Sequence, residues 1–447
     1  MTTLALAEKI TGTPRGAVPA PAVAEAKRSL LNWMGVAVGA ADHPMVDMVL
    51  EVAAAWGGQP QATVVGRGLK VDEHTAALVN GISSHIFDYD DTLLDTILHP
   101  SAPVWPALLA YGERHGLAGQ PLLEAFVLGV EAEQRVAQVV YPSHYDRGWH
   151  ITGSVGAFGA AAAVGWLMGL DARQMTYALG LAATQPVGLR EMFGTHTKAF
   201  HPGKAAANGL QAAYLAGKGF NSSMRSIEAP RGFAHVTSEA PKLERLTQGW
   251  GESWQIMYNS YKPFPCGVVI HPANDAVVRL RGEQGVRAAD VERLELSVHP
   301  LVLELTGKKE PRDGLEAKFS VYHCAAAGLI DGWVGLAQFK DQRVTAPDVI
   351  DLRRRVVATV DPSIAEDQIR ARAVLRDGRV AELYVEHCLG SKDNPMTNEQ
   401  LERKFGEAAA PVLGAAGARN LMDTIWQLGR ARNLEAVMAL TGPAVPR

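Results

Sequence analysis

Residues 80–106 read NGISSHIFDYDDTLLDTILHPSAPVWP, and this stretch combines the apolar spacing of a packed helix with a high density of acidic and histidine side chains. Ile82, Ile86 and Tyr89 recur at helical spacing, which indicates one apolar face that packs against a core. We therefore expect a helix over residues 72–89, with further helices before and after it.

The polar residues of the same stretch predict a functional face. His85, Asp88 and Thr92 are three and four residues apart, so on a continuous helix they share one side. Burying such a side is costly unless its groups are paired or bind a ligand. A solvated acidic helix end is the alternative. Because the apolar stripe places the acids beside a core, we interpret them as part of a candidate binding site.

The composition of the whole chain is that of a globular protein and excludes several classes of function. The chain has 447 residues, of which 47% are hydrophobic and 20% charged, and this length allows two or three domains. With 43 basic and 47 acidic residues the net charge is -4, so no overall field attracts nucleic acid or an anionic membrane. We therefore expect neither nucleic acid nor a membrane as a partner.

The cysteines and the N-terminus point to a reduced compartment. Cys266, Cys324 and Cys388 lack the short paired spacings of zinc or iron–sulfur sites, so we predict no metal and a cytoplasmic location. The first residues, MTTLALAEKITGT, mix acidic and basic side chains and contain no long apolar run, which argues against a signal peptide. No GxxxxGK or GxGxxG motif supports a nucleotide cofactor.

Hydrophobic periodicity divides the chain into two parts. Helical spacing dominates residues 1–265 and returns over residues 398–447, so we expect one large all-helical domain that the tail completes. Residues 266–397 mix helical and alternating segments, which is typical of a smaller α+β domain. The predicted fold class is therefore mainly α, with a large all-helical domain plus a smaller α+β domain.

The predicted strands of the smaller domain lie at residues 291–298 and 355–361 and in a hairpin over residues 372–387. In the hairpin, Asp377-Gly378 stands between two alternating runs, and this dipeptide favours a tight turn because glycine accepts a positive φ. These segments predict a small sheet.

Residues 151–169, ITGSVGAFGAAAAVGWLMG, are nearly all small or apolar. A membrane span is one interpretation of such a run. The many small residues and the lack of a second run of this kind favour the other interpretation, a helix buried among neighbouring helices.

Three further segments place cationic and aromatic side chains at loops or helix entries. They read SHYDRGWH at residues 143–150, GTHTKAFHPGKAAANG at residues 194–209 and SYKPFPCGVVIHP at residues 260–272. A single lysine or histidine is usually solvated or structural, and this is the alternative for each segment. Because the clusters recur beside buried helices, we predict that they converge on one pocket with cations for carboxylates and groups that move protons.

A set of motifs in a fixed order resembles the MmgE/PrpD family. The motifs are HIFDYDDT, HPSAPVWPALLA, GWHITG, GTHTKAFHPGKAA, YKPFPCGVVIHP, KFSVYHCAA and NPMTNEQLERKF, and the resemblance covers residues 20–405. The family contains 2-methylcitrate dehydratase, cis-aconitate decarboxylase and iminodisuccinate epimerase. The resemblance implies a helical and an α+β domain with an active site between them, a homodimer, and no metal, iron–sulfur cluster or other cofactor.

The resemblance also implies site residues at the matching motif positions. The catalytic candidates are Asp88, His99, Tyr145, His150 and Tyr322, and the substrate-binding candidates are Thr92, Lys198 and Lys262. The chain departs from the family where Gly267 and Val268 follow Cys266, because many members have an arginine there. One bidentate carboxylate partner is therefore missing from this position.

The chemistry expected of these residues is removal of a proton from a carbon next to a carboxylate. Lys198 and Lys262 would hold substrate carboxylates where negative charge develops, and Thr92 would add a neutral hydrogen bond. Histidine titrates near neutral pH, so His99 or His150 is the candidate base.

Asp88 would orient one imidazole, and Tyr145 or Tyr322 would move the second proton. We expect a cofactor-free lyase acting on a small hydroxy-polycarboxylate, most closely a 2-methylcitrate or citrate dehydratase. An epimerase or decarboxylase of a related di- or tricarboxylate is the alternative within enzymes. A catalytically silent binding protein is the alternative of another class.

Overall fold

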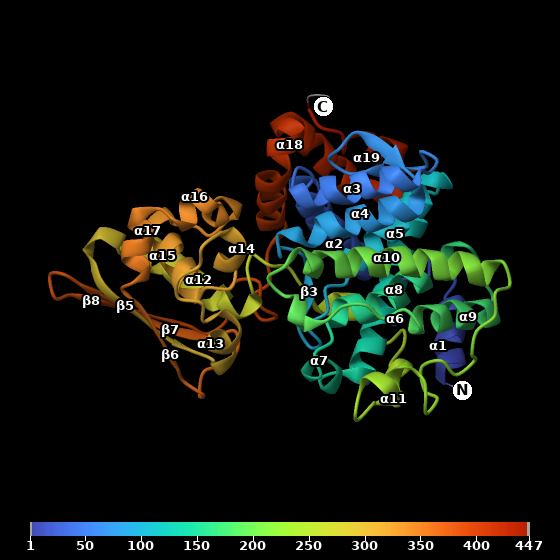
Figure 1. Ribbon diagram of the computed structural model, residues 1–447, viewed down its shortest axis with the longest axis horizontal. Helices are drawn as coiled ribbons and strands as arrows, with labels where there is room; N and C mark the ends of the chain where they lie inside the picture. Colours follow the sequence, from blue (N-terminus) through green and yellow to red (C-terminus); the bar gives the residue numbers. More distant parts are fainter. Residues whose placement is uncertain (1, 445–447) are drawn as a thin grey trace. The chain divides into compact units, whose positions relative to one another are not determined.

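The computed structural model describes residues 2–444, which divide into two compact units. Unit 1 holds the residues up to Ile86, Asp90–Asn259 and the residues from Asn398 onward, and unit 2 holds Phe87–Tyr89 and Ser260–Thr397. Helices form unit 1 almost entirely, whereas unit 2 combines helices with a four-stranded sheet (Figure 1). The predicted fold class is therefore confirmed.

Unit 1 is built from helices that follow one another along the chain, completed by helices from the C-terminal segment. They are α1 (Thr2–Thr11), α2 (Ala20–Gly39), α3 (Pro44–Trp56), α4 (Glu73–Ile86), α5 (Ser101–Arg114), α6 (Gly119–Val140), α7 (Ser143–Asp146), α8 (Ile151–Leu167), α9 (Ala172–Ala183), α10 (His196–Gly217), α11 (Phe233–Thr237), α18 (Asn398–Trp426) and α19 (Glu435–Ala439). The short strands β1 (Ala62–Val64) and β2 (Leu69–Val71) pair antiparallel, and β3 (Thr92–Leu93) precedes α5.

Helix α8 forms the core of unit 1, and all of its residues are buried. It packs against α5, α6, α9 and α10, and α10 runs beside it in Figure 1. Glycine permits the closest approach, because a Cβ atom at Gly209 of α10 would lie 2.6 Å from the carbonyl oxygen of Ala157. No helix within residues 2–444 is long and apolar enough to cross a bilayer. The small-residue run is a buried helix, as its composition predicted.

The C-terminal helix α18 packs on α2, near the other end of the chain. Phe405 lies against Gly35, where an added Cβ atom would come within 2.9 Å of the Phe405 ring. Gly414 interrupts α18 with a φ of 71°, so the helix bends there. The tail thus contributes directly to the core of unit 1.

Helix α6 buries Glu131, Glu133, Gln134 and Arg135 close together, and not all of these side chains have hydrogen-bond partners. Arg135 pairs with Glu131 at 2.6 Å between Nη2 and Oε1. Glu133 is also fully buried, but neither of its carboxyl oxygens has a hydrogen-bond partner among the described residues. Burial raises the pKa of Glu133 well above its usual range, and the charge of Asp91 raises it further. Burial therefore favours the neutral form of Glu133 in the folded protein.

We expect Glu133→Gln to stay within about 1 kcal/mol of the wild-type free energy of unfolding near pH 6, since the amide replaces a neutral acid of the same shape. Unfolded glutamate titrates near pH 4.3, about where the free side chain does. Above this pH the unfolded chain loses the Glu133 proton while the folded chain keeps it, so the free energy of unfolding falls as the pH rises toward the folded-state pKa. The glutamine variant has no proton to lose at this position and should not show this fall. Urea unfolding at a series of pH values measures both effects.

Glu133→Ala is the matched control, because it removes volume and is expected to lose about 2 to 4 kcal/mol. A glutamine variant as unstable as the alanine variant would contradict the neutral state, because it would mean that a charged and partnered carboxylate had been lost.

Unit 2 contains a sheet with the strand order β6-β5-β7-β8. The strands are β5 (Val291–Val298), β6 (Val356–Val360), β7 (Ile369–Leu375) and β8 (Val380–Val385). β5 pairs parallel with β6 and antiparallel with β7, and β7 pairs antiparallel with β8. The predicted strands are confirmed, and Gly378 takes the positive φ of 84° that the hairpin turn requires.

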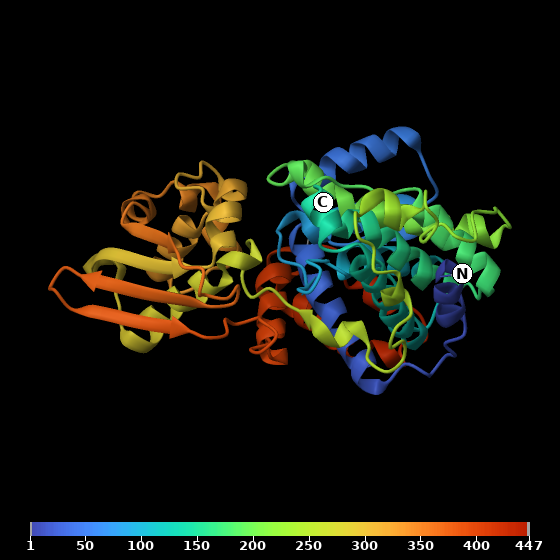
Figure 2. The ribbon, with the colours of Figure 1, turned by 90° about the horizontal axis from the view of Figure 1, so that it is seen from below.

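The helices of unit 2 lie mostly on one side of the strands in Figure 1, and Figure 2 shows the strands from the other side. The helices are α12 (His271–Gln284), α13 (Pro300–Thr306), α14 (Gly314–Ala317), α15 (Val321–Asp331), α16 (Asp341–Val344) and α17 (Pro347–Arg353). The buried side chains of β5 alternate with exposed ones, so one face of the strand joins a core with α12 and α15.

Candidate functional site

Four buried histidines from four different segments meet in unit 1. His85 lies near the end of α4, His99 precedes α5, His150 precedes α8, and His201 lies in α10. The ring centroids are 5.1 Å apart for His85 and His99, and 5.6 Å apart for His85 and His150. The rings of His150 and His201 are 5.2 Å apart. We call these four residues the histidine cluster.

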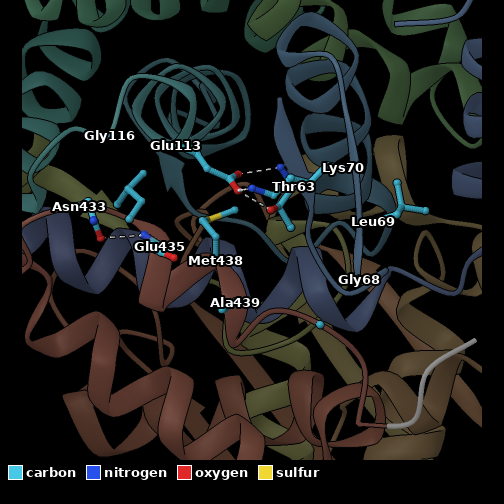
Figure 3. A pocket seen from close by; sticks show the side chains of 12 residues that line it. Thr63, Gly68, Leu69, Lys70, Glu113, Gly116, Asn433, Glu435, Met438 and Ala439 are labelled. Atoms are coloured by element: carbon cyan, nitrogen blue, oxygen red, sulfur yellow. Dashed lines mark hydrogen bonds and ion pairs between the residues drawn. The ribbon is translucent and has the colours of Figure 1, made fainter. Parts of the chain in front are cut away.

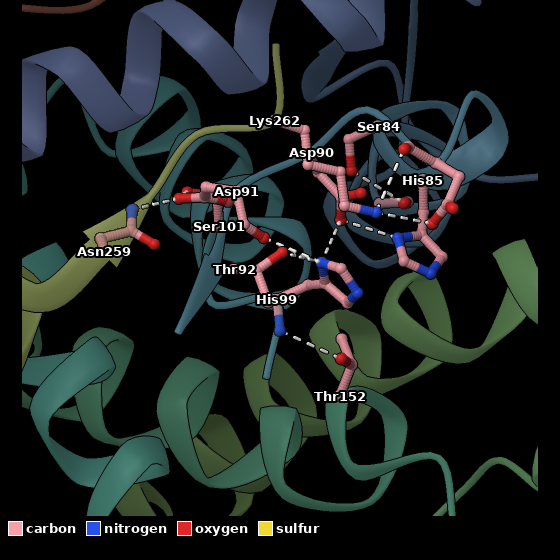
Figure 4. Close-up of polar contacts among 12 residues, drawn as sticks. Ser84, His85, Asp90, Asp91, Thr92, His99, Ser101, Thr152, Asn259 and Lys262 are labelled. Carbon is pink, nitrogen blue, oxygen red and sulfur yellow. Dashed lines mark hydrogen bonds and ion pairs between the residues drawn. The ribbon is translucent and has the colours of Figure 1, made fainter. Parts of the chain in front are cut away.

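Asp90 orients one member of the histidine cluster and lies close to a second (Figure 4). Its Oδ2 atom lies 2.7 Å from Nδ1 of His85 and 3.6 Å from Nδ1 of His99. An ionised carboxylate only accepts hydrogen bonds, so Nδ1 of His85 carries the hydrogen. Nε2 of His85 is buried and has no hydrogen-bond partner among the described residues. A carboxylate that fixes an imidazole in this way is the arrangement used by catalytic dyads.

His99 is fixed by its own neighbours in the chain. Its Nδ1 atom lies 2.8 Å from the carbonyl oxygen of Asp91 and 3.1 Å from Oγ1 of Thr92. A carbonyl oxygen only accepts, so Nδ1 donates and Nε2 is the nitrogen that can take up a proton. The His99 backbone N–H donates to Oγ1 of Thr152 at 3.1 Å, which ties the residue to α8.

The loop before His99 is strained. Leu93 and Leu98 exchange backbone hydrogen bonds, and Ile97 between them has a φ of 59°. A positive φ is a true outlier for a β-branched residue and costs of order 1–3 kcal/mol. The strain persists because Thr96 Oγ1 is anchored to Gln134 of α6 at 2.7 Å. Such strain often marks a site where one side chain must be aimed.

Asp91 binds hydroxyl and amide groups, whereas its neighbour Asp90 binds a histidine. Its Oδ2 atom accepts hydrogen bonds from Ser29 at 2.9 Å, from Ser101 at 2.6 Å and from Asn259 at 2.6 Å. Burial raises the pKa of Asp91 to about 6, against the opposing effect of these hydrogen bonds. Asp91 therefore links α2 and α5 to Asn259, whereas Asp90 lies beside the histidine cluster.

His150 and His201 form the other half of the histidine cluster. Their Nδ1 atoms are 2.9 Å apart. Burial lowers the pKa of His150 well below its usual range, and the charges of His85, Lys198, His201 and His99 lower it further. Burial, followed by His85 and Lys198, also lowers the pKa of His201 to about 4. Both rings are therefore neutral at pH 7.

Lys198 provides a cation beside this pair. It lies in the first turn of α10, and its ammonium group stands 5.5 Å from the ring centre of Phe193. Its charge contributes to the lowered pKa of both His150 and His201. An anionic ligand placed here would meet a lysine and two neutral imidazoles that its own charge would help to protonate.

Residues 87–89 belong to unit 2, where hydrogen bonds from Lys262, Lys318 and Tyr89 hold them. Lys262 Nζ donates to Oδ1 of Asp88 at 3.0 Å and to its carbonyl oxygen at 3.1 Å. Lys318 Nζ donates to the carbonyl oxygen of Phe87 at 2.7 Å. The Tyr89 hydroxyl donates to the carbonyl oxygen of Pro263 at 2.9 Å. The segment is thus bound at each of its residues.

This binding corrects the expectation of a helix over residues 72–89. Helix α4 ends at Ile86, and Asp88 has a φ of 52°, which no right-handed helix contains. His85, Asp88 and Thr92 therefore do not share a helix face. Aspartate tolerates this conformation better than most residues, and both the backbone carbonyl oxygen and Oδ1 of Asp88 accept hydrogen bonds from Lys262.

The two predicted tyrosines make contacts with other residues in the described structure. The Arg190 guanidinium stands 4.1 Å from the ring centre of Tyr145. Tyr322 lies in the core of unit 2, where burial raises its pKa and Lys309 stands 5.9 Å from its ring centre. Neither tyrosine is a member of the histidine cluster, and their roles stay predictions.

The structure thus brings together four predicted site residues in unit 1, namely Thr92, His99, His150 and Lys198, and it pairs Asp88 with Lys262 in unit 2. The sequence-based list of catalytic and substrate-binding candidates omitted His85, Asp90 and His201, although His85 was placed on the predicted polar face. Their signal was present, because each stands in a motif beside a chosen residue.

Two other features could bind a small ligand or a metal. A surface pocket of about 540 Å³ lies between the β1–β2 hairpin and α19, and Glu113 inside it already pairs with Lys70 (Figure 3). In unit 2, Asp367, His387 and Asp393 are the one described group of three whose possible ligand atoms lie within 4.8 Å of one another. Neither feature contains a member of the histidine cluster.

Comparison with known proteins gives a consistent result along the chain. Residues 4–246 match the MmgE/PrpD N-terminal domain, and residues 264–428 match the MmgE/PrpD C-terminal domain. Cis-aconitate decarboxylase of Aspergillus terreus is 25% identical over 452 residues, covering 95% of this chain and 92% of the relative. The Mus musculus protein of the same name is 26% identical, covering 95% and 90%. The Homo sapiens protein is 25% identical, covering 99% and 95%. The chain belongs to the MmgE/PrpD family.

Proposed function

We propose that this enzyme is a lyase that acts on a small polycarboxylate by adding or removing a proton at a carbon next to a carboxylate. The observation that carries the proposal is the histidine cluster, in which Asp90 orients the buried imidazole of His85 and Lys198 lies beside His150 and His201. Such a set combines proton donors and acceptors with a cation, and this chemistry needs both. The names of the cis-aconitate decarboxylase relatives support the same substrate class.

Loss of carbon dioxide or of a proton leaves negative charge on the reacting carbon. Lys198 would stabilise this charge or hold an adjacent carboxylate, and Thr92 would add a hydrogen bond. His99 would exchange a proton through Nε2, because its Nδ1 is committed to the Asp91 carbonyl oxygen. Tyr145 or Tyr322 is retained as the donor of a second proton, and Asp88 with Lys262 as a second polar pair for the substrate.

Substrate charge would switch the state of the histidine cluster. His150 is neutral in the ligand-free protein because burial and neighbouring positive charge lower its pKa. Substrate carboxylates bound nearby would offset the neighbouring positive charge, raise the pKa of His150 and favour its imidazolium form. A bound substrate would thus make it easier for His150 to accept a proton during the reaction.

Two reactions of this class lead the proposal. The motifs in the sequence favour dehydration of a 2-methylcitrate- or citrate-type acid, and the relatives favour decarboxylation of a cis-aconitate-type acid. Because the relatives match over nearly the whole chain, decarboxylation is the first reaction to test. Epimerisation would use the same carbanion-like intermediate and is the third candidate.

NMR spectroscopy in D₂O separates these reactions. We expect loss of carbon dioxide with one solvent deuterium in the product for a decarboxylase, and a new alkene signal from a hydroxy acid for a dehydratase. Deuterium in a recovered substrate with an inverted centre would identify an epimerase. A panel of cis-aconitate, citrate and 2-methylcitrate that stays unchanged, although each acid binds, would contradict the proposal and support a silent binding protein.

We also propose a homodimer in the cytoplasm. Helix α3 exposes Met48, Val52 and Trp56 at a spacing of four residues, and Trp56 is 79% exposed. An apolar stripe of this kind on a soluble protein favours burial against another surface, and a second copy is the partner that the family resemblance implies. Sedimentation should give a dimer for the wild type and a monomer for Val52→Glu/Trp56→Glu.

A further inference from the structure

The contact between His150 and His201 joins two nitrogen atoms of the same type. The Nδ1 atoms lie 2.9 Å apart, and both side chains are buried. Only one hydrogen atom fits between two nitrogens at this distance, so one ring donates and the other accepts. A charged imidazolium carries hydrogen on both nitrogens. The two rings therefore cannot be charged together, and the pair holds at most one extra proton.

The backbone around the pair fixes this geometry. The His150 N–H donates to the carbonyl oxygen of Gly188 at 3.0 Å, and a β-bridge joins Trp149 to Leu189. Gly188 has a φ of 101°, and a Cβ atom there would lie 2.9 Å from Cγ of His201 and 3.2 Å from Cβ of His150. A residue other than glycine would push the two rings apart. The contact is thus built by three segments rather than left to two mobile side chains.

A buried histidine with a purely structural role looks different in the same unit. His144 directs Nδ1 to the carbonyl oxygen of Thr237 at 3.2 Å and Nε2 to Oγ of Ser154 at 2.7 Å. Neither partner can take up a proton at neutral pH. The partner of His150 is a second imidazole, whose Nδ1 can accept a proton passed along the contact even though burial lowers its pKa to about 4.

We propose that His201 is a positioning residue that stores one proton for His150, so that His150 can first accept and later return a proton through the same nitrogen. This inference rests on the proposed function of the histidine cluster. In the accepting step, an N–H bond forms at Nε2 of His150, its Nδ1–H bond breaks, and an N–H bond forms at Nδ1 of His201. His201 then carries the charge, and the reverse transfer restores it to His150.

The first test needs no substrate. Full-length protein labelled with ¹⁵N at its histidine nitrogens should show scalar coupling between the two Nδ1 atoms, with the rings in opposite tautomers. The coupling should vanish in His201→Asn, which identifies the signals. Both rings in the same tautomer, or no coupling in the wild type, would overturn the inference.

The second test is kinetic. His201→Asn keeps an amide near the position of Nδ1 but cannot accept a proton, so kcat should fall about 10-fold or more while KM changes less than about twofold. His144→Asn is the matched control for the loss of a buried imidazole and should retain kcat within about twofold. Wild-type kcat in His201→Asn, or an equal loss in both variants, would refute proton storage.

The experiments distinguish failure of the proposed lyase function from failure of proton storage by His201. A wild-type protein that turns over none of the acids refutes the lyase assignment, whereas the nitrogen coupling in the same protein still decides whether the pair shares a proton.

Discussion

His99→Asn is expected to lower kcat by about 10²- to 10⁴-fold, the range that a positioned proton-transfer group contributes. Asparagine places an amide nitrogen near Nδ1, so the hydrogen bond to the Asp91 carbonyl oxygen can persist. The nitrogen that exchanges the proton, Nε2, is lost. Steady-state kinetics with the acid identified by NMR measures the effect, and thermal unfolding shows whether the fold is kept.

His99→Gln and His74→Gln complete this experiment. His99→Gln removes the anchored Nδ1 and should lose activity and some stability together. His74 lies in α4 outside the histidine cluster, so His74→Gln should keep kcat. Wild-type activity in His99→Asn would remove His99 from the list of catalytic residues.

Lys262→Met is expected to destabilise the protein by about 3 to 5 kcal/mol, because it leaves the carboxylate of Asp88 buried without its ammonium partner. Both side chains are largely buried, and the ion pair is 3.0 Å long. The ammonium group also holds the Asp88 carbonyl oxygen at 3.1 Å, so the backbone turn loses a support as well. Denaturant unfolding measures the loss.

The double variant Asp88→Asn/Lys262→Met is the control for this effect. Removing the charge of Asp88 should recover part of the stability, so the double variant should be less destabilised than the sum of the single variants. Strict additivity would mean that the two charges do not stabilise one another. Activity should be compared at a temperature where each variant is folded, because a substrate-binding role for Lys262 and its structural role would otherwise be confused.

The sequence was most informative where structure depends on near neighbours. The periodicity of α8 and the Asp377-Gly378 turn predicted a buried helix and a hairpin, because side-chain spacing and a positive φ are local properties. The same reasoning failed at the end of α4. The contacts that stop the helix come from Lys262 and Lys318, which lie 174 and 231 residues further along the chain.

The candidate site shows the same limit. The motifs identified Thr92, His99, His150 and Lys198, which the structure places in one region of unit 1. His201 stands three residues after Lys198, but a lone histidine in a helix is usually structural. Only the distance between its Nδ1 atom and that of His150 gives it a different interpretation. Such pairings depend on how three separate segments fold together.

The chain passes from unit 1 to unit 2 and back between Ile86 and Asp90. The two units therefore cannot be exchanged between relatives by cutting the chain only at residues 259 and 398. A chimera that takes residues 260–397 from a relative also replaces the partners of Phe87, Asp88 and Tyr89. Such a graft must therefore also carry residues 87–89 of the same parent. Otherwise the segment between His85 and Asp90 loses the hydrogen-bond partners that hold it.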